Sequence, residues 1–399
     1  MTTFADLIAP FSEAEFFAEY YGKKPLHIQR PEADVSGILS WDSFNDALEQ
    51  APFWTDQSLR IAFNNHPAPP ESFCTPVETL EGHTINRADP ARVKALVGVG
   101  ATLVANRIHE VSPGVRRAAK AIQERTQAAI AANVYCSFKG VQAFQSHYDI
   151  HDVFVVQVEG EKTWNIWTGR EDRPVSHVGP GEAGAAYLMR QRGALMWQIR
   201  MRPGDVLYLP RGQYHDALAE DGATLHVTFS ISPLTGFVLF DMLKEEARHD
   251  ALFRDYIPSH DVDNGGAMRA HLERLADRIR EIAASPLIAE EIAGKQREKR
   301  IGLAEYGLPE TRPPHFYAVA GIACEMSRRD AGYVLVGPGG DIALGAAHRA
   351  VDWLLRQRQF SEEELIARFP QAAPDHLRQL LGTLESRGYV ERAALPGRA

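Results

Sequence analysis

The sequence GDVLYLPRGQYH occupies residues 204–215 and decides which fold the chain can adopt. It fits the pattern G-x5-P-x-G-x2-H, with a run of strand-forming residues before Pro210. Such a strand brings the chain to Pro210, and Gly212 then permits a tight turn because glycine reaches backbone angles that other residues avoid. The next strand begins with His215. The spacing therefore predicts a histidine that points into the interior of a β-barrel.

A second motif lies upstream, where SHYDIHDVF occupies residues 146–154. On a strand, His147 and Asp149 are two residues apart and face the same way. Together with His215 they supply two imidazoles and one carboxylate, the ligand set of non-haem Fe(II) oxygenases. The 66 positions from Asp149 to His215 leave room for about four strands of ~5–6 residues, enough to carry the chain around a double-stranded β-helix. The alternative is that His147 and Asp149 form a surface pair and His215 caps a turn.

The residues after this motif indicate how many ligands the site offers. His151 shares a face with His147 and Asp149 on a strand, so we expect it to line the pocket, with a role as a further ligand left open. Apolar residues fill positions 153–156, where a four-ligand site would need a glutamate. Three ligands leave coordination positions open, which favours an oxygenase that uses a cosubstrate.

The composition is that of a soluble globular protein and excludes several other classes. Of the 399 residues, 45% are hydrophobic and 24% are charged, which excludes a disordered or fibrous chain. The formal net charge of −9 argues against nucleic acid as a partner. No apolar run approaches the ~18 residues of a membrane span, and residues 1–6 lack the pattern of a signal peptide. The three cysteines form no disulfide framework or zinc motif, so we expect a cytoplasmic protein without membrane contact.

The character of the sequence changes along the chain and predicts an α+β protein in three parts. Residues 115–132 are rich in alanine and predict a helix, whereas 133–232 hold short apolar runs broken by glycine and proline, as in a barrel. The runs 153–158 and 163–167 suggest a hairpin. After Pro233 an apolar stripe recurs at helical spacing: Met268, Leu272, Leu275, Ile279 and Ile282. Three helical segments and a terminal strand beyond residue 340 indicate a winged helix.

Three stretches of the barrel region resemble the Jumonji-C ribosomal oxygenase group of the cupin superfamily: NVY at 133–135, HYD at 147–149 and VFVVQVEGEKTW at 153–164. That group consists of Fe(II)- and 2-oxoglutarate-dependent protein hydroxylases. The resemblance implies a catalytic cupin domain over residues 1–235, built on a double-stranded β-helix with N-terminal helical elements. It also implies a helical dimerisation region over 236–340 and a winged-helix-like domain over 341–399.

The resemblance also implies roles for individual residues. The iron ligands of the group fall on His147, Asp149 and His215, and Lys162 matches the residue that binds the distal carboxylate of 2-oxoglutarate. Asn133 and Tyr135 match positions that form hydrogen bonds with this cosubstrate, and O₂ completes the reaction. Without the resemblance, Lys162 would be interpreted as an exposed residue at the turn of a hairpin. We expect Trp164 to pack in the core.

The substrate is the part of the function that the sequence leaves open. The group hydroxylates side chains of proteins or peptides and forms homodimers, but residues 137–146 match its pattern only loosely. A natural-product precursor peptide or a small molecule therefore remains an alternative substrate. A further alternative is a ligand-sensing regulator whose winged helix binds DNA. Residues 345–399 hold eight Arg and no Lys against seven Asp plus Glu, and so lack the basic surface that phosphates require.

Overall fold

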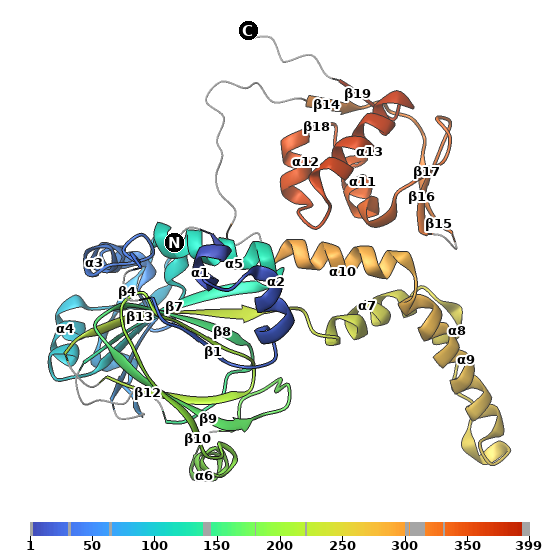
Figure 1. Cartoon of the computed structure of the whole chain (residues 1–399). Coiled ribbons are helices and arrows are strands. Elements are labelled where there is room, and N and C mark those ends of the chain that lie inside the picture. The colour runs from blue at the N-terminus through green and yellow to red at the C-terminus, as the bar shows by residue number, and fades with distance from the viewer. Residues whose placement is uncertain are drawn as a thin grey trace, which may run out of the picture. The chain divides into compact units, whose positions relative to one another are not determined.

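Figure 1 shows the computed structural model of the chain, which describes residues 3–30, 33–63, 66–138, 145–179, 181–219, 222–299, 303, 316–329 and 332–392. The chain divides into two compact units, Met1–Pro233 and Leu234–Ala399. We describe each unit by itself. None of the helices in these ranges is long and apolar enough to cross a membrane.

Two facing antiparallel sheets and a separate two-stranded hairpin, β4-β5, contain the strands of the first unit. The larger sheet has the strand order β1-β11-β8-β13-β7-β6-β2-β3, and the smaller has the order β10-β9-β12. In Figure 1 the strands β7, β13 and β8 lie above β9, β10 and β12. The strands are β1 Leu26–Ile28, β2 Leu59–Phe63, β3 His66–Pro67, β4 Cys74–Glu78, β5 Thr84–Ala88, β6 Thr102–Ala105, β7 Ala129–Ser137, β8 Asp152–Glu159, β9 Lys162–Arg170, β10 Leu195–Met201, β11 Val206–Leu209, β12 Gln213–Leu218 and β13 Thr224–Ser232.

The apolar run of β8 is buried on both of its faces. On the inner face Val153 and Val155 pack with side chains of both sheets in one cluster. On the outer face Phe154 stacks on Phe16, with ring centroids 5.5 Å apart, and the ring of Tyr208 lies close by. Phe16 belongs to the N-terminal helical segment, which therefore covers this face of the sheet. A strand buried on both faces needs apolar residues at every position, which explains its unbroken run.

The arrangement confirms the predicted double-stranded β-helix and corrects two local predictions. Four strands, β8 to β11, separate Asp149 from His215 in the described chain, as the spacing indicated. The hairpin predicted for 153–167 is wrong, because β8 and β9 lie in different sheets and the chain crosses between them at Gly160. The helix predicted over 115–132 ends at Thr126. Residues 129–132 instead pair with β13, so sheet pairing overrides the helix preference of alanine there.

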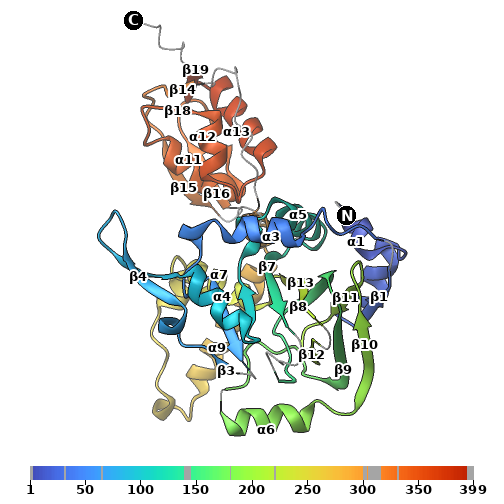
Figure 2. The same cartoon turned by 90° about the vertical axis from the view of Figure 1, so that its left-hand side faces the viewer.

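Short helices surround the two sheets. In Figure 2, α6 lies beside the ends of β9 and β10. The helices of the first unit are α1 Phe4–Ile8, α2 Glu13–Glu15 continued by the π-helical turn Phe16–Tyr20, α3 Trp41–Leu48, α4 Pro90–Gly98, α5 Pro113–Thr126 and α6 Glu182–Gln191, with 3₁₀ turns at Ala51–Phe53, Pro70–Ser72 and Ile108–Glu110.

The second unit begins with a run of helices that share a small core. Met242, Ile282 and Ile288 are buried together, with Phe253 and Ile292 packed against them. The helices are α7 Phe237–Ala247, α8 Ala251–Arg254, a 3₁₀ turn His260–Val262, α9 Gly266–Ala283 and α10 Pro286–Glu298. The predicted stripe lies on α9, but only Ile282 of its five residues is buried, while Leu272 and Ile279 remain 46% and 40% exposed.

The C-terminal part of this unit has a larger core of its own. Leucines on one face of α13 pack with Val351, Phe360 and Leu365. Its elements are β14 Phe316–Val319, β15 Glu325–Arg329, β16 Gly332–Val336, β17 Ile342–Ala343, a 3₁₀ turn Gly345–Ala347, α11 His348–Leu354, β18 Gln359–Ser361, α12 Glu362–Arg368, α13 Pro374–Ser386 and β19 Val390–Arg392. The three helices α11, α12 and α13 lie within 341–399, where a winged helix was predicted, but their sheet of order β18-β14-β19 includes β14, which lies in the 236–340 region predicted to be helical.

The turn at Gly212 gives a test of how the barrel is built. Gly212 has φ +85°, and a Cβ there would lie 2.1 Å from the carbonyl oxygen of Glu171. We expect Gly212→Ala to lower the free energy of unfolding by about 3 kcal/mol or more, since a left-handed backbone and a clash both oppose it. Gly222→Ala is the control, because φ is +69° but a Cβ meets nothing within 4 Å. This control should lower the free energy of unfolding by only about 1–2 kcal/mol. Equal urea midpoints for the two variants would contradict this account.

Candidate metal centre

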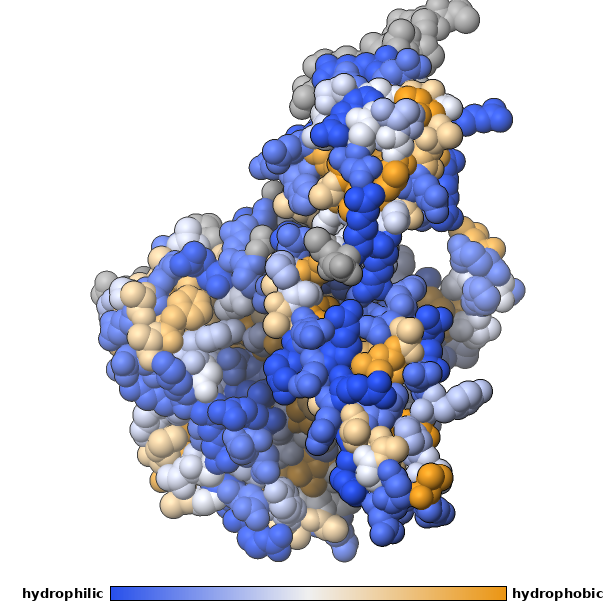
Figure 3. All heavy atoms as spheres, turned by 90° about the vertical axis from the view of Figure 1, so that its right-hand side faces the viewer, coloured by the Kyte–Doolittle hydropathy of each residue, from blue (hydrophilic) through white to orange (hydrophobic). Residues whose placement is uncertain are grey.

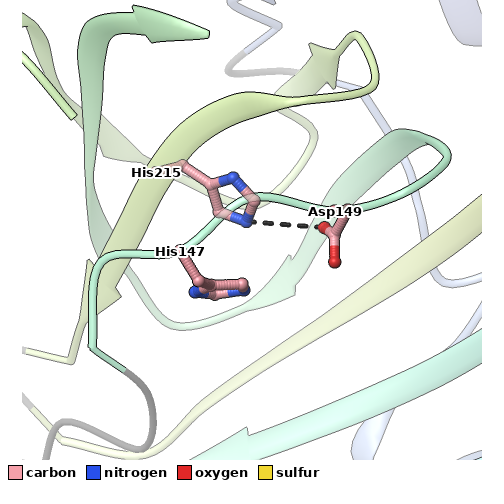
Figure 4. Close-up of side chains that lie close together, drawn as sticks. All are labelled: His147, Asp149 and His215. Atoms are coloured by element: carbon pink, nitrogen blue, oxygen red, sulfur yellow. Dashed lines mark ion pairs between the residues drawn. The ribbon is translucent and has the colours of Figure 1, made fainter. Parts of the chain in front are cut away.

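Three side chains from two distant parts of the sequence converge inside the barrel. One ligand atom from each of His147, Asp149 and His215 can be chosen so that all lie within 4.8 Å of one another. Figure 4 shows the two imidazoles and the carboxylate turned toward one another. His215 Nε2 lies 3.6 Å from Asp149 Oδ2, and the two imidazole centroids are 4.5 Å apart. The arrangement has the size of a metal site, since three ligands at ~2 Å from one ion lie about 3–4 Å from each other.

Backbone hydrogen bonds bring these residues together. His147 N donates to His215 O at 3.0 Å, and His215 N donates to His147 O at 2.9 Å. Gly212 N also donates to Asp149 O at 2.9 Å. The sequence predicted His147 and Asp149 on a strand. In the structure His147 forms an isolated bridge with His215, and Asp149 lies in the loop that precedes β8.

Both histidines are oriented by carbonyl groups behind them. The Nδ1 atom of His147 lies 2.8 Å from Gln145 O, and that of His215 lies 2.9 Å from Gln213 O. A carbonyl oxygen only accepts, so Nδ1 carries the proton in each ring. The lone pair is then on Nε2, the nitrogen that faces the site. Such outer contacts fix the tautomer and orientation of metal-binding histidines.

The charge states at the site suit a divalent cation. Burial lowers the pKa of His215 to about 4, helped by the neighbouring His147, so the ring is neutral near pH 7. Burial alone would raise the pKa of Asp149, but the surrounding histidines, His215 foremost, bring that pKa below its usual value. The carboxylate is therefore ionised. Two imidazoles and one carboxylate form a ligand set for Fe(II) and related metals.

A pocket of about 530 Å³, open to solvent, leads to the three residues. Lys162 begins β9, where the chain enters the smaller sheet, and is only 5% exposed. It donates a hydrogen bond to Ser137 Oγ on β7 at 3.1 Å. Burial lowers the pKa of Lys162 to about 8. The pocket is lined by Tyr135, His147, Asp149, Val153, Lys162, Trp164, His215, Ala217, His226 and Thr228.

The other residues singled out from the sequence occupy different positions. Tyr135 lines the pocket, whereas Asn133 is not among its lining residues. Asn133 Oδ1 accepts from Arg107 N at 3.1 Å, and its side chain is hydrogen-bonded to Tyr135. His151 is half-buried near Asp149 and belongs neither to the pocket lining nor to the metal-binding group. Its Nδ1 lies 3.2 Å from Asp152 O.

The donor set of the pocket suits an anionic ligand with several oxygen atoms. Among the described residues that line it, Asp149 is the only carboxylate, while Lys162 contributes an ammonium group. Two buried nitrogens in the pocket, Trp164 Nε1 and His226 Nδ1, have no hydrogen-bond partner among the described residues. Buried polar groups are rarely left unpaired in proteins. A dicarboxylic oxo acid would supply acceptors for them, so the residues fit 2-oxoglutarate as well as the metal.

Sequence reasoning missed three polar residues of this region: Ser137, His226 and Thr228. His226 lies directly opposite Tyr135 in the β7–β13 pairing. A signal was present, because Thr224, His226 and Thr228 alternate with apolar residues along β13. On a barrel strand, this alternation places the polar residues on one face. The pairing register that brings them to the pocket could not be derived from one strand alone.

Comparison with known proteins identifies the domain. Residues 107–236 match the JmjC domain family. The chain is 27% identical over 288 residues to the bifunctional lysine-specific demethylase and histidyl-hydroxylase NO66 of Dictyostelium discoideum, covering 69% of this chain and 52% of that protein. It is 29% identical over 230 residues to ribosomal oxygenase 1 of Danio rerio, covering 56% of this chain and 39% of that protein. The X-ray structure of E. coli ycfD aligns over 96% of this chain and 98% of that one, with TM-score 0.51 and 15% identity.

These similarities confirm the resemblance to the Jumonji-C ribosomal oxygenase group and its cupin-type fold. The domain match and the His147–Asp149–His215 group also confirm the expected Fe(II) cofactor and 2-oxoglutarate cosubstrate. The chain spans about half, or less, of the length of these two curated relatives. Their names therefore carry no conclusion about the substrates of this chain.

Proposed function

We propose that this chain, whose residues 107–236 form a JmjC domain, is an oxygenase that hydroxylates an unactivated C–H bond in a side chain of a protein or peptide. The observation that carries the proposal is the convergence of His147, Asp149 and His215 at one end of a pocket that contains the buried Lys162. A facial set of three ligands leaves room for a chelating cosubstrate and O₂ at the same metal.

The metal site follows from the orientation of its three ligands. His147 and His215 would bind Fe(II) through Nε2, because their Nδ1 atoms face backbone carbonyls. Asp149 would add one carboxylate oxygen and neutralise part of the charge. With iron and 2-oxoglutarate bound, O₂ is consumed, 2-oxoglutarate becomes succinate and CO₂, and the substrate C–H becomes C–OH. The protein supplies binding, orientation and exclusion of water for this chemistry.

The remaining pocket residues would hold the cosubstrate. Lys162 is a buried cation with two N–H groups beyond the one that it gives to Ser137, and so suits the distal carboxylate. Tyr135 lines the pocket and would donate its hydroxyl, since burial raises its pKa to about 12 and keeps it protonated. Asn133 would act through Tyr135, to which it is hydrogen-bonded.

The substrate class is a protein or peptide, by analogy with the relatives. One is named a histidyl-hydroxylase and the other a ribosomal oxygenase, which favours hydroxylation of a ribosomal protein. The first is also named a lysine-specific demethylase, so removal of a methyl group is the competing reaction. A natural-product precursor peptide or a small molecule could use the same iron chemistry. A ligand-sensing regulator would bind its ligand without turnover.

Succinate formation tests the function. Purified protein with Fe(II), ascorbate and 2-oxoglutarate should form succinate faster when the correct peptide is present, and that peptide should gain the mass of one oxygen atom. His-containing ribosomal peptides and methyl-lysine peptides form the two arms of the screen. His215→Ala should reduce turnover by more than about 100-fold, because a metal ligand is lost. His83→Ala, an exposed histidine on the β4–β5 hairpin, is the control. Unchanged turnover in His215→Ala would exclude this site.

The pH dependence of binding tests Lys162. Its pKa of about 8 in the free pocket means that the ammonium is lost as the pH rises through 8. Only the charged form pairs with the distal carboxylate, so the dissociation constant of 2-oxoglutarate should be flat below pH 8 and rise by about tenfold per pH unit above it. Lys162→Met should bind about 30-fold or more weakly at pH 7 and lose this dependence. Calorimetry on the Mn(II)-loaded wild type and variant measures the dissociation constant of 2-oxoglutarate at each pH. The same pH profile in the two proteins would contradict the assignment.

We also propose the three-part division 1–235, 236–340 and 341–399, with a helical dimerisation region and a winged-helix-like end. The helical segment supports a two-fold dimer because it leaves large apolar side chains uncovered. Figure 3 faces this side of the molecule and shows apolar patches among hydrophilic side chains. Among the described residues of the segment, seven large apolar side chains are exposed: Phe237, Phe240, Tyr256, Ile257, Val262, Leu272 and Ile279. A second copy of the chain would bury the same patch on both partners.

Light scattering tests the dimer. The wild-type protein at micromolar concentration should have twice the chain mass of 44.3 kDa. The double variant Leu272→Glu, Ile279→Glu should fall to the single-chain mass, because two carboxylates per chain would be buried in the interface. Leu80→Glu replaces a fully exposed leucine outside the segment and should stay dimeric. A double variant that keeps the wild-type mass, or that unfolds, would show that the stripe is not an interface.

A further inference from the structure

His226 is a buried residue of the pocket that is neither a candidate metal ligand nor one of the cosubstrate residues named above. It lies on β13, directly opposite Tyr135 on β7, and the two rings stack with centroids 4.9 Å apart and planes 1° from parallel. The indole of Trp164 meets it edge-on at 5.5 Å. His226 is only 2% exposed, yet its Nδ1 has no hydrogen-bond partner among the described residues. An unmade hydrogen bond in a buried site is costly, so a ligand atom is its expected partner.

The ring of His226 is neutral and can donate. Burial, together with the nearby Lys162 ammonium, lowers its pKa well below the ordinary value for histidine. A neutral imidazole carries one N–H and can place it on either nitrogen. His226 therefore adds a hydrogen-bond donor to the pocket without adding a second positive charge.

Lys162 and His226 reach the same region from opposite sheets. Lys162 belongs to β9 of the smaller sheet and His226 to β13 of the larger one. Lys162 donates a hydrogen bond to Ser137 on β7, the strand that pairs with β13. Lys162 and His226 both line the pocket that contains the three candidate metal ligands.

We propose that His226 is a cosubstrate-binding residue, which donates a hydrogen bond from Nδ1 to the distal carboxylate of 2-oxoglutarate and shares that carboxylate with Lys162. The inference rests on the function proposed above. One cation and one neutral donor match a single carboxylate, which carries one negative charge and accepts at two oxygens. The pocket thereby selects oxo acids with a carboxylate at the far end.

A pair of ligands separates this role from simple packing. 2-Oxoglutarate and 2-oxopentanoate share the oxo-acid end, but the second has a methyl group in place of the distal carboxylate. Calorimetry with Mn(II)-loaded protein measures binding of each ligand without turnover. His226→Phe keeps an aromatic ring for stacking on Tyr135 and removes the donor. We expect it to weaken 2-oxoglutarate about ten- to hundredfold, the range for a hydrogen bond to a charged group, and to change 2-oxopentanoate less than about threefold.

Two further variants complete the experiment. His226→Asn keeps a donor near the position of Nδ1 and loses the ring, so it should weaken both ligands alike and retain the preference for 2-oxoglutarate. His271→Phe, which replaces a buried histidine of the second unit, is the matched control and should leave both affinities unchanged. Melting temperature and metal content verify that each variant is folded.

The outcomes distinguish the inference from the function on which it rests. If wild-type protein does not bind 2-oxoglutarate, the proposed function fails. If wild-type protein binds it and His226→Phe weakens both ligands equally, His226 only packs and the inference is overturned. The same conclusion follows if His226→Phe binds 2-oxoglutarate as well as the wild type does.

Discussion

Two reciprocal backbone hydrogen bonds between His147 and His215 hold the site together. They join a loop that precedes β8 to the strand β12, which the chain reaches only after passing through four further strands. Each histidine then uses Nδ1 to contact a carbonyl two residues before it, so that both rings present Nε2 to the same point. The metal site therefore depends on backbone pairing before any metal is bound.

The pocket beyond the metal site depends on the pairing of β7 with β13. That register places Tyr135 opposite His226, and after the crossing at Gly160 the chain enters β9, where Lys162 lines the same pocket. Each of these residues is polar on the inner face of a barrel that is otherwise packed with Val155, Ile166 and Leu207. Position in the sheet, rather than closeness in the sequence, determines which polar residues can act on one ligand.

This dependence explains what the sequence could and could not predict. The grouping of His147, Asp149 and His215 could be predicted, because the motif spacing indicates a tight turn at Gly212 with a strand on either side of it. The sequence alone would place Lys162 at an exposed turn, because its burial follows from a crossing between sheets that resembled a hairpin. The position of His226 in the pocket was missed because it follows from the cross-strand register. Residues 129–132 were mistaken for helix because alanine favours helices and the pairing with β13 is non-local.

Without a ligand, the pocket buries a charged group and two nitrogens that have no hydrogen-bond partner among the described residues. Burial lowers the pKa of the Lys162 ammonium to about 8, because a charge is disfavoured away from water. Trp164 and His226 each add a buried nitrogen without a partner among the described residues. A carboxylate at this end would neutralise the charge and satisfy a donor together, so ligand binding and stability are coupled. Apolar residues at these positions would remove the unpaired polar atoms, and with them the contacts proposed for the cosubstrate.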